Sequence, residues 1–389
     1  MKIIIFDGTF SSTAFIRRLM QGLVKSGLQI SVIGFNEANP SPVVGVNYVS
    51  LGSNQSKIGL LRTSLTLALK EGKPASWIKV LSNILSGDRI SLQKQNLDLV
   101  LKKLQPDIIH LQWPSLLPWM QPYFQNRDFK IVLSQRGFHT NVRPFIDPVN
   151  FKYLHETYPQ LDGLHSVSKA ISKVGRKIGT PLHGLDRVVY TGLDLEKMGF
   201  KTKVNMKSCL QLISVGRPHW KKDYPTAIKA CASLKQEDLD FHYTIVGGEG
   251  DEESLFLIHE LGLSEHITLT GKLPQTEVFQ KIQEADVMLL PSIEEGIANV
   301  AVEAMALGTL VISTNCGGME ELIANEKEGW IVPTRDFKAM AKAILNFTYL
   351  NSDEIHTLSW AARKKVEQQH TEVKMVNDML GLYQKVLNV

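Results

Sequence analysis

The stretch VMLLPSIEEGIANVAVEAMAL, residues 287–307, decides the fold of this chain. It opens with an apolar run that predicts a buried strand ending at Leu290, and a polar turn follows. From about Asn299 to Leu307 the apolar residues have helical spacing, and a second apolar run, Leu310–Ser313, comes directly after the helix. This succession of strand, turn, helix and strand is typical of a parallel α/β sheet.

Segments of the same kind recur along the whole chain. Their apolar runs lack the polar alternation of a sheet with one wet face, and helix-period stretches separate them. The fold class that this predicts is α/β with doubly wound, Rossmann-like parallel sheets. The first helix is predicted at Phe10–Ser26 and the last at Glu372–Leu387. The predicted strands are Lys2–Phe6, Gln29–Ile33, Ile108–Leu111, Ile131–Ser134, Gly163–Ser166, Arg187–Tyr190, Leu210–Val215, Phe241–Val246, Ile267–Thr270, Val287–Leu290, Leu310–Ser313 and Trp330–Val332.

A polar stretch between Thr191 and Lys207 interrupts this alternation and marks the predicted domain boundary. It divides the chain into an N-terminal domain, residues 1–195, and a C-terminal domain, residues 208–370. Residues 1–199 carry 24 Lys and Arg against 13 Asp and Glu, whereas the remainder carries 19 against 26. Two domains of opposite charge predict different partners, with a ligand in a cleft outside the carboxyl ends of the strands.

Composition excludes several classes of protein. The 389-residue chain has a formal net charge of +4, which is too small for a chain-wide nucleic-acid binder. Its three cysteines, Cys209, Cys231 and Cys316, lie far apart, so neither a disulfide framework nor a cysteine-built zinc site is expected. No apolar run approaches the roughly 18 residues of a membrane span, and the first residues lack a signal-type core. We expect a cytoplasmic protein.

The usual nucleotide and metal motifs are absent or misplaced. The chain has no G-x-x-x-x-G-K-[ST] loop, and Gly247-Gly248-Glu249-Gly250 lacks the G-x-G-x-x-G spacing. A D-x-D sequence occurs at residues 238–240, but it precedes a predicted strand and would lie at the wrong edge of the sheet. We therefore expect neither a metal nor a cofactor.

The first informative turn, VGRPHWKKD at residues 215–223, follows the strand Leu210–Val215. Gly216 permits a sharp turn, and a helix is predicted to begin near Tyr224. Arg217 and Lys222 would then lie beside a helix N-terminus, where they could bind phosphate oxygens. A solvated basic loop explains this spacing equally well.

The second informative turn lies within the stretch quoted first. The amides of Ile297 to Val300 would be unpaired donors of the first helical turn, which form a ready site for an anion. Glu295 and Glu303 form an E-x7-E pair, a spacing that Glu252 and Glu260 also show. The pair at Glu295 and Glu303 straddles a strand–turn–helix junction, where sugar and ribose hydroxyls would be natural partners for the carboxylates.

Three segments of the C-terminal domain resemble the retaining glycosyltransferases of family 4, which have the GT-B fold. They are VGRPHWKKDYPTAIKA (215–230), IVGGEGDEESLFLIHELGLSEHITLTGKLPQTEVFQKIQEADVMLLPS (245–292) and IEEGIANVAVEAMALGTLVISTNCGGMEELI (293–323). The N-terminal domain matches more loosely, through LKKLQPDIIHLQW, SQRGFHT, SVSKAISKVG and VVYTGLDLEKM. The resemblance implies that the C-terminal helix, residues 371–389, crosses back to the first domain.

The resemblance also implies roles for residues of the donor site. Arg217 and Lys222 would bind the donor diphosphate, Glu303 the ribose hydroxyls and Glu295 the donor sugar. Further donor-binding positions would be Gly8, Gly216, Lys272, Leu273, Gly296, Ile297, Ala298, Asn299 and Val300.

The loop after the strand Ile131–Ser134 departs from the family pattern. Family members commonly carry His-Gly there, whereas this chain has Arg136-Gly137, with His139 two residues further on. Arg136 keeps its proton at physiological pH and cannot act as a base, although it could neutralise a leaving diphosphate. Either Arg136 or His139 would face the reacting sugar. His110, at the end of a strand, is interpreted as a core histidine.

The function implied is transfer of a sugar, with retention and without metal, from a nucleotide-diphosphate donor to a hydroxyl of a glycan, a lipid-linked molecule or a small molecule. Synthesis of a cell-surface polysaccharide or glycoconjugate would be the setting. A sugar-nucleotide epimerase of the same fold and a non-catalytic nucleotide-sugar-binding protein are the alternatives.

A basic stretch in the N-terminal domain is a second candidate for function. Residues 57–103 carry nine Lys and Arg against three Asp and Glu, together with apolar residues from Leu60 to Leu69 and from Trp77 to Leu81. Such a segment could lie on an anionic membrane surface and place the protein peripherally on the inner membrane face. Amphipathic helices packed on the sheet, with solvated lysines, explain the pattern equally well.

Overall fold

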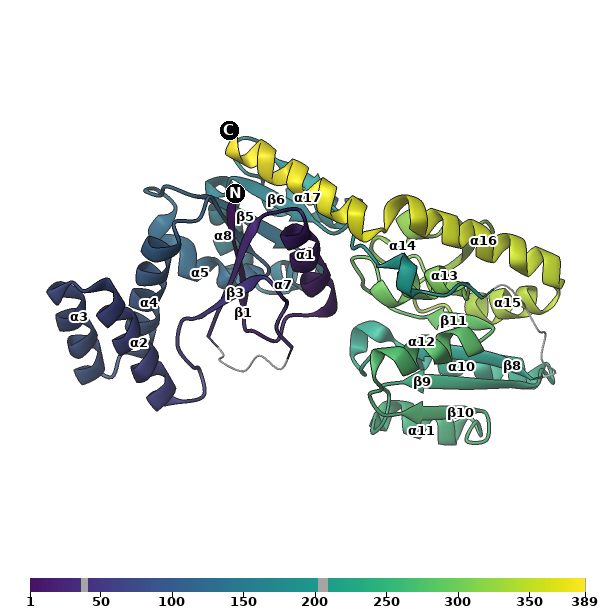
Figure 1. Cartoon of the computed structure of the whole chain (residues 1–389). Coiled ribbons are helices and arrows are strands. Elements are labelled where there is room, and N and C mark those ends of the chain that lie inside the picture. The colour runs from purple at the N-terminus through teal and green to yellow at the C-terminus, as the bar shows by residue number, and fades with distance from the viewer. Residues whose placement is uncertain (36–40, 202–208, 389) are drawn as a thin grey trace. The chain divides into compact units, whose positions relative to one another are not determined.

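The computed structural model describes residues 1–35, 41–201 and 209–388, which form two compact units (Figure 1). Unit 1 comprises residues 1–167, 172–192 and 372–389, and unit 2 comprises residues 168–171 and 193–371. The chain therefore enters unit 2 at residue 193 and returns to unit 1 with its last helix. Each unit is built on its own parallel sheet.

The sheet of unit 1 has the order β3-β2-β1-β4-β5-β6-β7, and every pair of neighbours is parallel. Strands β2 and β3 follow β1 toward one edge of the sheet, whereas β4 to β7 extend toward the other edge. The strand order therefore reverses between β1 and β4, which is the place where ligands bind in doubly wound sheets. The strands are β1 (Lys2–Gly8), β2 (Gln29–Gly34), β3 (Val46–Ser50), β4 (Ile108–Leu111), β5 (Lys130–Gln135), β6 (Gly163–Ser166) and β7 (Asp186–Val188).

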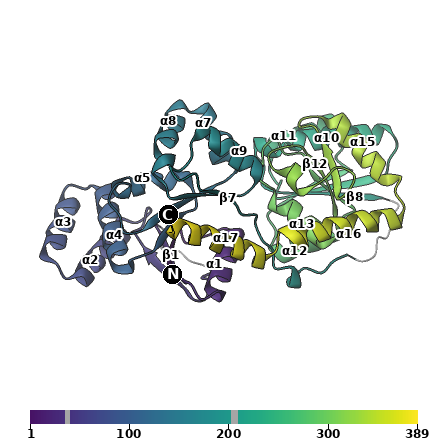
Figure 2. The ribbon, with the colours of Figure 1, turned by 90° about the horizontal axis from the view of Figure 1, so that it is seen from above.

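Helices cover both faces of this sheet. On one face α1 (Ala14–Lys25) and α17 (Glu372–Leu387) lie side by side, and their contact is close (Figures 1 and 2). A Cβ on Gly22 of α1 would lie 2.2 Å from a methyl carbon of Val376, so only glycine fits there. The other helices of unit 1 are α2 (Lys57–Glu71), α3 (Pro74–Leu85), α4 (Arg89–Leu104), α5 (Leu117–Met120), α6 (Gly137–Asn141), α7 (Arg143–Ile146), α8 (Pro148–Thr157) and α9 (Lys169–Ile178).

The sheet of unit 2 is also parallel and has the order β10-β9-β8-β11-β12-β13. Its direction of growth reverses between β8 and β11, and the two reversals make both sheets doubly wound. The strands are β8 (Leu210–Val215), β9 (Phe241–Val246), β10 (Ile267–Thr270), β11 (Val287–Leu290), β12 (Leu310–Thr314) and β13 (Gly329–Val332).

Two apolar cores sandwich the second sheet. One contains residues of α10, α11 and α15, and the other contains residues of α12, α13, α14 and α16. The helices are α10 (Tyr224–Gln236), α11 (Glu252–Glu260), α12 (Gln275–Glu284), α13 (Asn299–Leu307), α14 (Met319–Leu322), α15 (Phe337–Thr348) and α16 (Ser352–Gln369).

The predicted α/β class with two Rossmann-like sheets is confirmed, and local differences have physical causes. The first helix begins at Ala14 rather than Phe10, because Phe10 is buried against Tyr48 and the residues between are small and polar. The edge strand β3 was not predicted, since its residues are only half-buried and lack a long apolar run. The strand predicted at Arg187–Tyr190 is β7, which begins and ends earlier, at Asp186 and Val188.

The helices α2, α3 and α4 form an additional layer with a small core of their own. The outer side of α4 contributes to this core through Leu92 and Leu99, while Leu97 and Leu101 of the same helix pack toward the sheet. No helix in the described residues is both long enough and apolar enough to cross a bilayer.

Candidate functional site

The two turns singled out in the sequence follow neighbouring strands of unit 2. Strands β8 and β11 pair directly, at the point where the order of the sheet reverses. The turn after β8 leads through a short 3-10 segment, Trp220–Lys222, into α10, and the turn after β11 leads into α13. A backbone hydrogen bond of 2.7 Å from the amide of Ile293 to the carbonyl of Lys221 joins the two turns.

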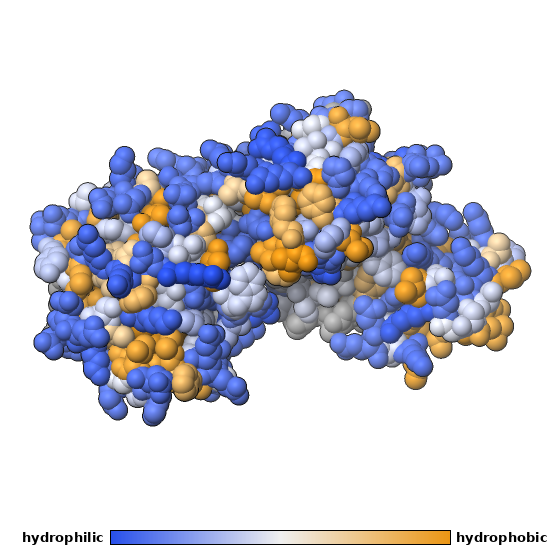
Figure 3. Space-filling view, turned by 180° about the vertical axis from the view of Figure 1, so that it is seen from behind, coloured by the Kyte–Doolittle hydropathy of each residue, from blue (hydrophilic) through white to orange (hydrophobic). Residues whose placement is uncertain are grey.

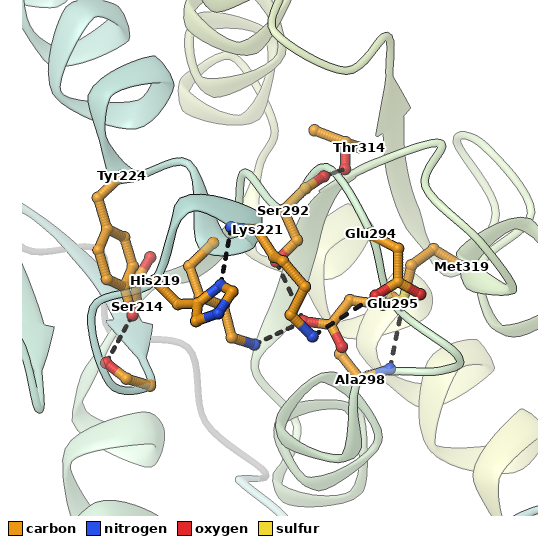
Figure 4. Close-up of polar contacts among 12 residues, drawn as sticks. Ser214, His219, Lys221, Tyr224, Ser292, Glu294, Glu295, Ala298, Thr314 and Met319 are labelled. Atoms are coloured by element: carbon orange, nitrogen blue, oxygen red, sulfur yellow. Dashed lines mark hydrogen bonds and ion pairs between the residues drawn. The ribbon is translucent and has the colours of Figure 1, made fainter. Parts of the chain in front are cut away.

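Two ion pairs also connect these turns (Figure 4). The ammonium of Lys222 lies 2.6 Å from Oε1 of Glu295, and that of Lys221 lies 3.5 Å from Oε2 of Glu294. The hydroxyl of Ser292 donates a further bond of 3.2 Å to Oε1 of Glu295. Both bonds to Glu295 use the same oxygen, so Oε2 retains capacity for another donor. The sequence placed Lys222 and Glu295 in one site but did not predict that they pair.

Two glycines after β12 support the turn that carries Glu295. A Cβ on Gly317 would lie 1.6 Å from the carbonyl oxygen of Glu295, and a Cβ on Gly318 would lie 2.2 Å from that of Gly296. The amide of Gly318 donates a bond of 2.8 Å to the latter carbonyl. The hydroxyl of Thr314 also donates to the carbonyl of Ser292. The backbone of β12 and its loop therefore fixes the position of the Glu295 side chain.

The predicted cations gather around His219. Burial lowers the pKa of His219, and the charges of Lys221, Arg217 and Lys222 lower this pKa further. Arg217 is exposed, whereas Lys222 is half-buried through its pair with Glu295. Arg217 and Lys222 thus both lie close enough to His219 to affect its pKa, and their binding of phosphate stays a prediction.

The helix α13 begins within the predicted set of amide donors. Asn299 and Val300 are the first two residues of α13, so helix geometry provides no partner for their amides. The prediction of a free amide was wrong for Ala298, whose N–H bonds to the sulfur of Met319 at 3.4 Å (Figure 4). Gly296 is buried, whereas Ile297 is half-buried.

Of the remaining predicted donor-site residues of unit 2, Gly216 and Glu303 belong to these two turns and the helix that follows, whereas Lys272 and Leu273 lie apart from them. Gly216 has φ +155°, and its carbonyl accepts a bond of 2.7 Å from the Tyr224 hydroxyl, which fixes the turn after β8. Glu303 is a half-buried residue of α13, one turn beyond its start. Lys272 is exposed and Leu273 is half-buried; both follow β10, two strands away from β8.

In unit 1, a second polar cluster lies where the order of the first sheet reverses. Trp113, just after β4, donates a bond of 2.8 Å to the buried carboxylate of Asp7, at the end of β1. Burial raises the pKa of Asp7, and the bond from Trp113 and the charge of Arg136 oppose this rise. Asp7 and Trp113 were not predicted as site residues, because their contact joins positions 106 residues apart in the sequence.

Arg136 belongs to this cluster. Its guanidinium donates a bond of 2.9 Å to Gln112 and stacks 4.3 Å from the centre of the Phe15 ring. Burial lowers the pKa of Arg136 to about 10, against the opposing effect of Asp7, so the group remains charged at neutral pH. Arg136 therefore brings positive charge to this end of the sheet.

His139 and Gly8 complete the predicted set in unit 1. The His139 ring is half-buried, and its centre lies 6.0 Å from that of Trp113, so His139 and Arg136 both border this indole. Gly8 has φ +82°, and a Cβ there would lie 3.2 Å from a methyl carbon of Leu116. A side chain at this position would therefore be strained by the backbone conformation and crowded by its neighbour.

His110 is a satisfied core histidine, as interpreted from the sequence. Its Nδ1 lies 2.7 Å from the Tyr383 hydroxyl and its Nε2 lies 2.8 Å from the Ser134 hydroxyl. Ser134 also lies 2.8 Å from Nδ1 of His165, whose Nε2 bonds to the carbonyl of Val189 at 3.0 Å. The carbonyl of Val189 can only accept, so Nε2 of His165 carries a proton and its Nδ1 accepts from Ser134. Ser134 then accepts from Nε2 of His110, and Nδ1 of His110 accepts from Tyr383, with both imidazoles neutral.

Comparison with known proteins finds a family model that matches most of the second unit. Residues 200–365 match the family described as Glycosyl transferases group 1. WcaL of Escherichia coli, named as a colanic acid biosynthesis glycosyltransferase, is 33% identical over 216 residues, which are 54% of this chain and 53% of WcaL. AmsK of Erwinia amylovora, named as an amylovoran biosynthesis glycosyltransferase, is 32% identical over 237 residues, which are 57% of this chain and 58% of AmsK. The chain spans little more than half the length of these curated relatives.

Solved structures share the fold along the whole chain. Sucrose-phosphate synthase from Thermosynechococcus elongatus has a TM-score of 0.75 at 17% identity and covers 100% of both chains. HepE of Anabaena in complex with UDP has a TM-score of 0.70 at 15% identity and covers 99% of this chain and 100% of that chain. The predicted GT-B architecture is thereby confirmed.

Proposed function

We propose, from the glycosyl transferases group 1 domain that residues 200–365 form within a GT-B fold, that this protein transfers a sugar from a nucleotide-diphosphate donor to an acceptor hydroxyl. One observation carries this proposal. Two adjacent strand ends, at the reversal of the sheet of unit 2, bring Lys222 into contact with Glu295 in the turn that leads to α13, and Arg217 lies in the same turn as Lys222. Positive groups and helix amides suit a diphosphate, and a carboxylate suits sugar hydroxyls.

The ion pair between Lys222 and Glu295 is compatible with this role. An ammonium has three donors, of which the bond to Glu295 uses one, so the others are available to phosphate oxygens. Glu295 would orient Lys222 through Oε1 and accept a bond from a sugar hydroxyl through Oε2. Arg217, which is exposed, would close on the diphosphate when the donor binds.

The chemical step that we propose retains the anomeric configuration and needs no metal. The bond from the anomeric carbon to the phosphate oxygen breaks, and its electron pair stays on the diphosphate. The acceptor oxygen forms the new bond on the same face, and its proton passes to the departing phosphate oxygen. Lys222, Arg217 and the amides of α13 stabilise the charge that develops on the leaving group. Glu295 is held by Lys222 and Ser292, so we assign it no nucleophilic role.

The acceptor is proposed to bind unit 1, and the product to belong to a cell-surface polysaccharide or glycoconjugate. The names of WcaL and AmsK, which refer to colanic acid and amylovoran biosynthesis, support a polysaccharide product. Arg136 and His139, which border Trp113 at the sheet reversal of unit 1, are the groups we propose to lie nearest the reacting sugar.

A donor screen tests the proposal directly. UDP-glucose is the first candidate, since HepE of the same fold has been solved with it. A donor at 100 times its dissociation constant is expected to raise the free energy of unfolding by about 2.7 kcal/mol, measurable as a thermal shift. The donor that binds is then incubated with and without acceptor oligosaccharides, and nucleoside diphosphate and sugar products are followed.

The products distinguish the three functions. Release of nucleoside diphosphate with a glycosylated acceptor supports the transferase. An altered donor sugar in the absence of acceptor identifies an epimerase, and binding without turnover identifies a nucleotide-sugar-binding protein. Either of the last two results contradicts the proposal.

Replacing Glu303 with alanine is expected to lower kcat/KM for the donor roughly 10- to 100-fold. A lost hydrogen bond between a carboxylate and the ribose accounts for that range, because bonds to charged groups contribute about 1.5–3 kcal/mol. Glu260→Ala is the matched control, since Glu260 is exposed and ends the equally spaced pair on α11. Equal values of kcat/KM for the donor in the two folded variants would show that Glu303 does not bind the donor.

A further inference from the structure

The layer formed by α2 and α3 presents apolar side chains to solvent. Ile58 is 80% exposed, Ile78 68% and Leu85 88%, and Leu69 and Leu81 are also exposed, as is Ile90 at the adjoining start of α4. Residues 78, 81 and 85 repeat at helical spacing on the outer side of α3. Over α2 and α3, at the right of Figure 3, apolar surface alternates with hydrophilic surface. We call this surface, with Ile58, Leu69, Ile78, Leu81, Leu85 and Ile90, the α2–α3 face.

Packing of the helices on one another does not require these exposed residues. The inner side of α3 uses a different set, Trp77, Val80 and Ile84, to pack into the small core between α2, α3 and α4. Leu60 and Val80 belong to the apolar residues predicted as candidates for membrane binding, but both are buried in this core. α3 is thus apolar on two sides, whereas a helix at the surface of a soluble protein usually has one apolar stripe.

Positive charge surrounds the α2–α3 face. Lys57, Arg62, Lys70, Lys73 and Lys79 are all exposed, and none of them forms a salt bridge within the described part of the chain.

The acidic groups of the same layer are already engaged. Glu71 accepts a bond from Ser76, Asp88 caps α4 by accepting from Ser91, and Asp98 accepts from Tyr123. These bonds leave the three carboxylates charged, but the five exposed cations outnumber them, so the net charge of the α2–α3 face is positive.

We propose that the α2–α3 face binds the surface of an anionic lipid bilayer. Exposed apolar side chains flanked by lysines and arginines are the pattern of segments that lie in a membrane interface, where the apolar groups enter the headgroup region and the cations meet anionic lipids. A neutral partner would leave the positive charges without a counterpart, and an acidic polar partner would leave the exposed apolar side chains without one.

The face is connected to the end of the sheet at which ligands bind. Arg89 and Gln93, in the first half of α4, bond to the carbonyl of Ser53 and the side chain of Asn54 at 2.7 and 2.8 Å, in the loop that follows β3. The exposed residues Ile58 and Leu85 lie at the helix ends nearest this loop. If the protein is the transferase proposed above, bilayer binding would bring unit 1 to a lipid-linked acceptor.

Vesicle flotation with the full-length protein tests the proposal without donor or acceptor. We expect the protein to float with phosphatidylcholine vesicles that contain phosphatidylglycerol, to stay behind with phosphatidylcholine alone, and to be released by added salt. Ile78→Gln/Leu85→Gln should weaken binding roughly tenfold, and Lys70→Gln/Lys79→Gln roughly 25-fold. All four side chains are exposed, so the variants should fold.

Matched controls and a second readout make the outcome decisive. Val149→Gln/Leu182→Gln and Lys152→Gln/Lys173→Gln replace equally exposed residues of unit 1 outside the face and should leave flotation unchanged. Equal recovery with neutral and anionic vesicles, or equal losses in face and control variants, would overturn the proposal. A dimer in light scattering that Ile78→Gln/Leu85→Gln dissociates would assign the face to a second copy instead. Because the assay needs no turnover, each of these results leaves the transferase proposal intact.

Discussion

Replacing Lys222 with alanine is expected to lower kcat by two to three orders of magnitude while the fold persists. In the proposed reaction this ammonium faces the charge that forms on the leaving diphosphate, and removing one such group typically costs roughly 3–4 kcal/mol of transition-state stabilisation. Single-turnover kinetics with saturating donor measure the effect. Lys229→Ala on α10 is the control, because Lys229 is an exposed lysine of the helix that follows the same turn.

The ion pair with Glu295 allows a sharper version of this experiment. If Lys222 acted only by holding Glu295, the double variant Lys222→Ala/Glu295→Gln would be no slower than Glu295→Gln alone. A direct role on the diphosphate predicts a further large loss in the double variant. A folded Lys222→Ala protein with near-normal kcat would contradict the proposed donor site.

Acidification from pH 7 to pH 5 is expected to destabilise unit 1 by at least about 2 kcal/mol. Burial lowers the pKa of His110 well below its usual value and lowers that of His165 to about 3, and nearby positive charge lowers both further. The unfolded chain takes up protons as pH falls through about 6.5, whereas the folded protein does not. Stability is therefore complete above that pH and is lost as pH falls toward about 3. His165 accounts for about 2 kcal/mol of the loss at pH 5, and His110 adds to it in the same direction.

Urea denaturation at the two pH values measures this loss. In His165→Gln about 2 kcal/mol of the pH dependence should disappear, even though the variant is less stable at pH 7. His183→Gln is the control, since His183 is an exposed histidine of the same unit. The same pH dependence in wild type and His165→Gln would show that the buried imidazoles do not control acid stability.

Much of unit 2 could be predicted from the sequence because its strands are buried on both faces. The bounds of β8 and β11, and of α13 between Asn299 and Leu307, agree with the predicted ones. Continuous apolar runs that end at Gly, Pro or polar residues mark such elements clearly. The half-buried edge strand β3 has no such run, and it was missed.

The contacts that complete the two clusters could not be predicted in this way. The glycines at 317 and 318 support Glu295 through backbone proximity, and Asp7 meets Trp113 from a distant strand. Neither contact leaves a local spacing pattern, because each depends on which strands become neighbours in the sheet. The segments CGGMEEL (316–322) and DIIHLQW (107–113) contain the two glycines and Trp113. Both segments resemble the family, and this resemblance was the sequence feature that could have indicated the contacts.

The return of α17 to unit 1 has a consequence for synthesis of the protein. Val376, Met379 and Tyr383 of α17 share a core with Leu19 and Leu23 of α1, and Tyr383 also bonds to His110. The ribosome synthesises residues 193–371 before α17. During that time the part of the apolar sheet face that α17 covers in unit 1 therefore remains exposed in the nascent chain.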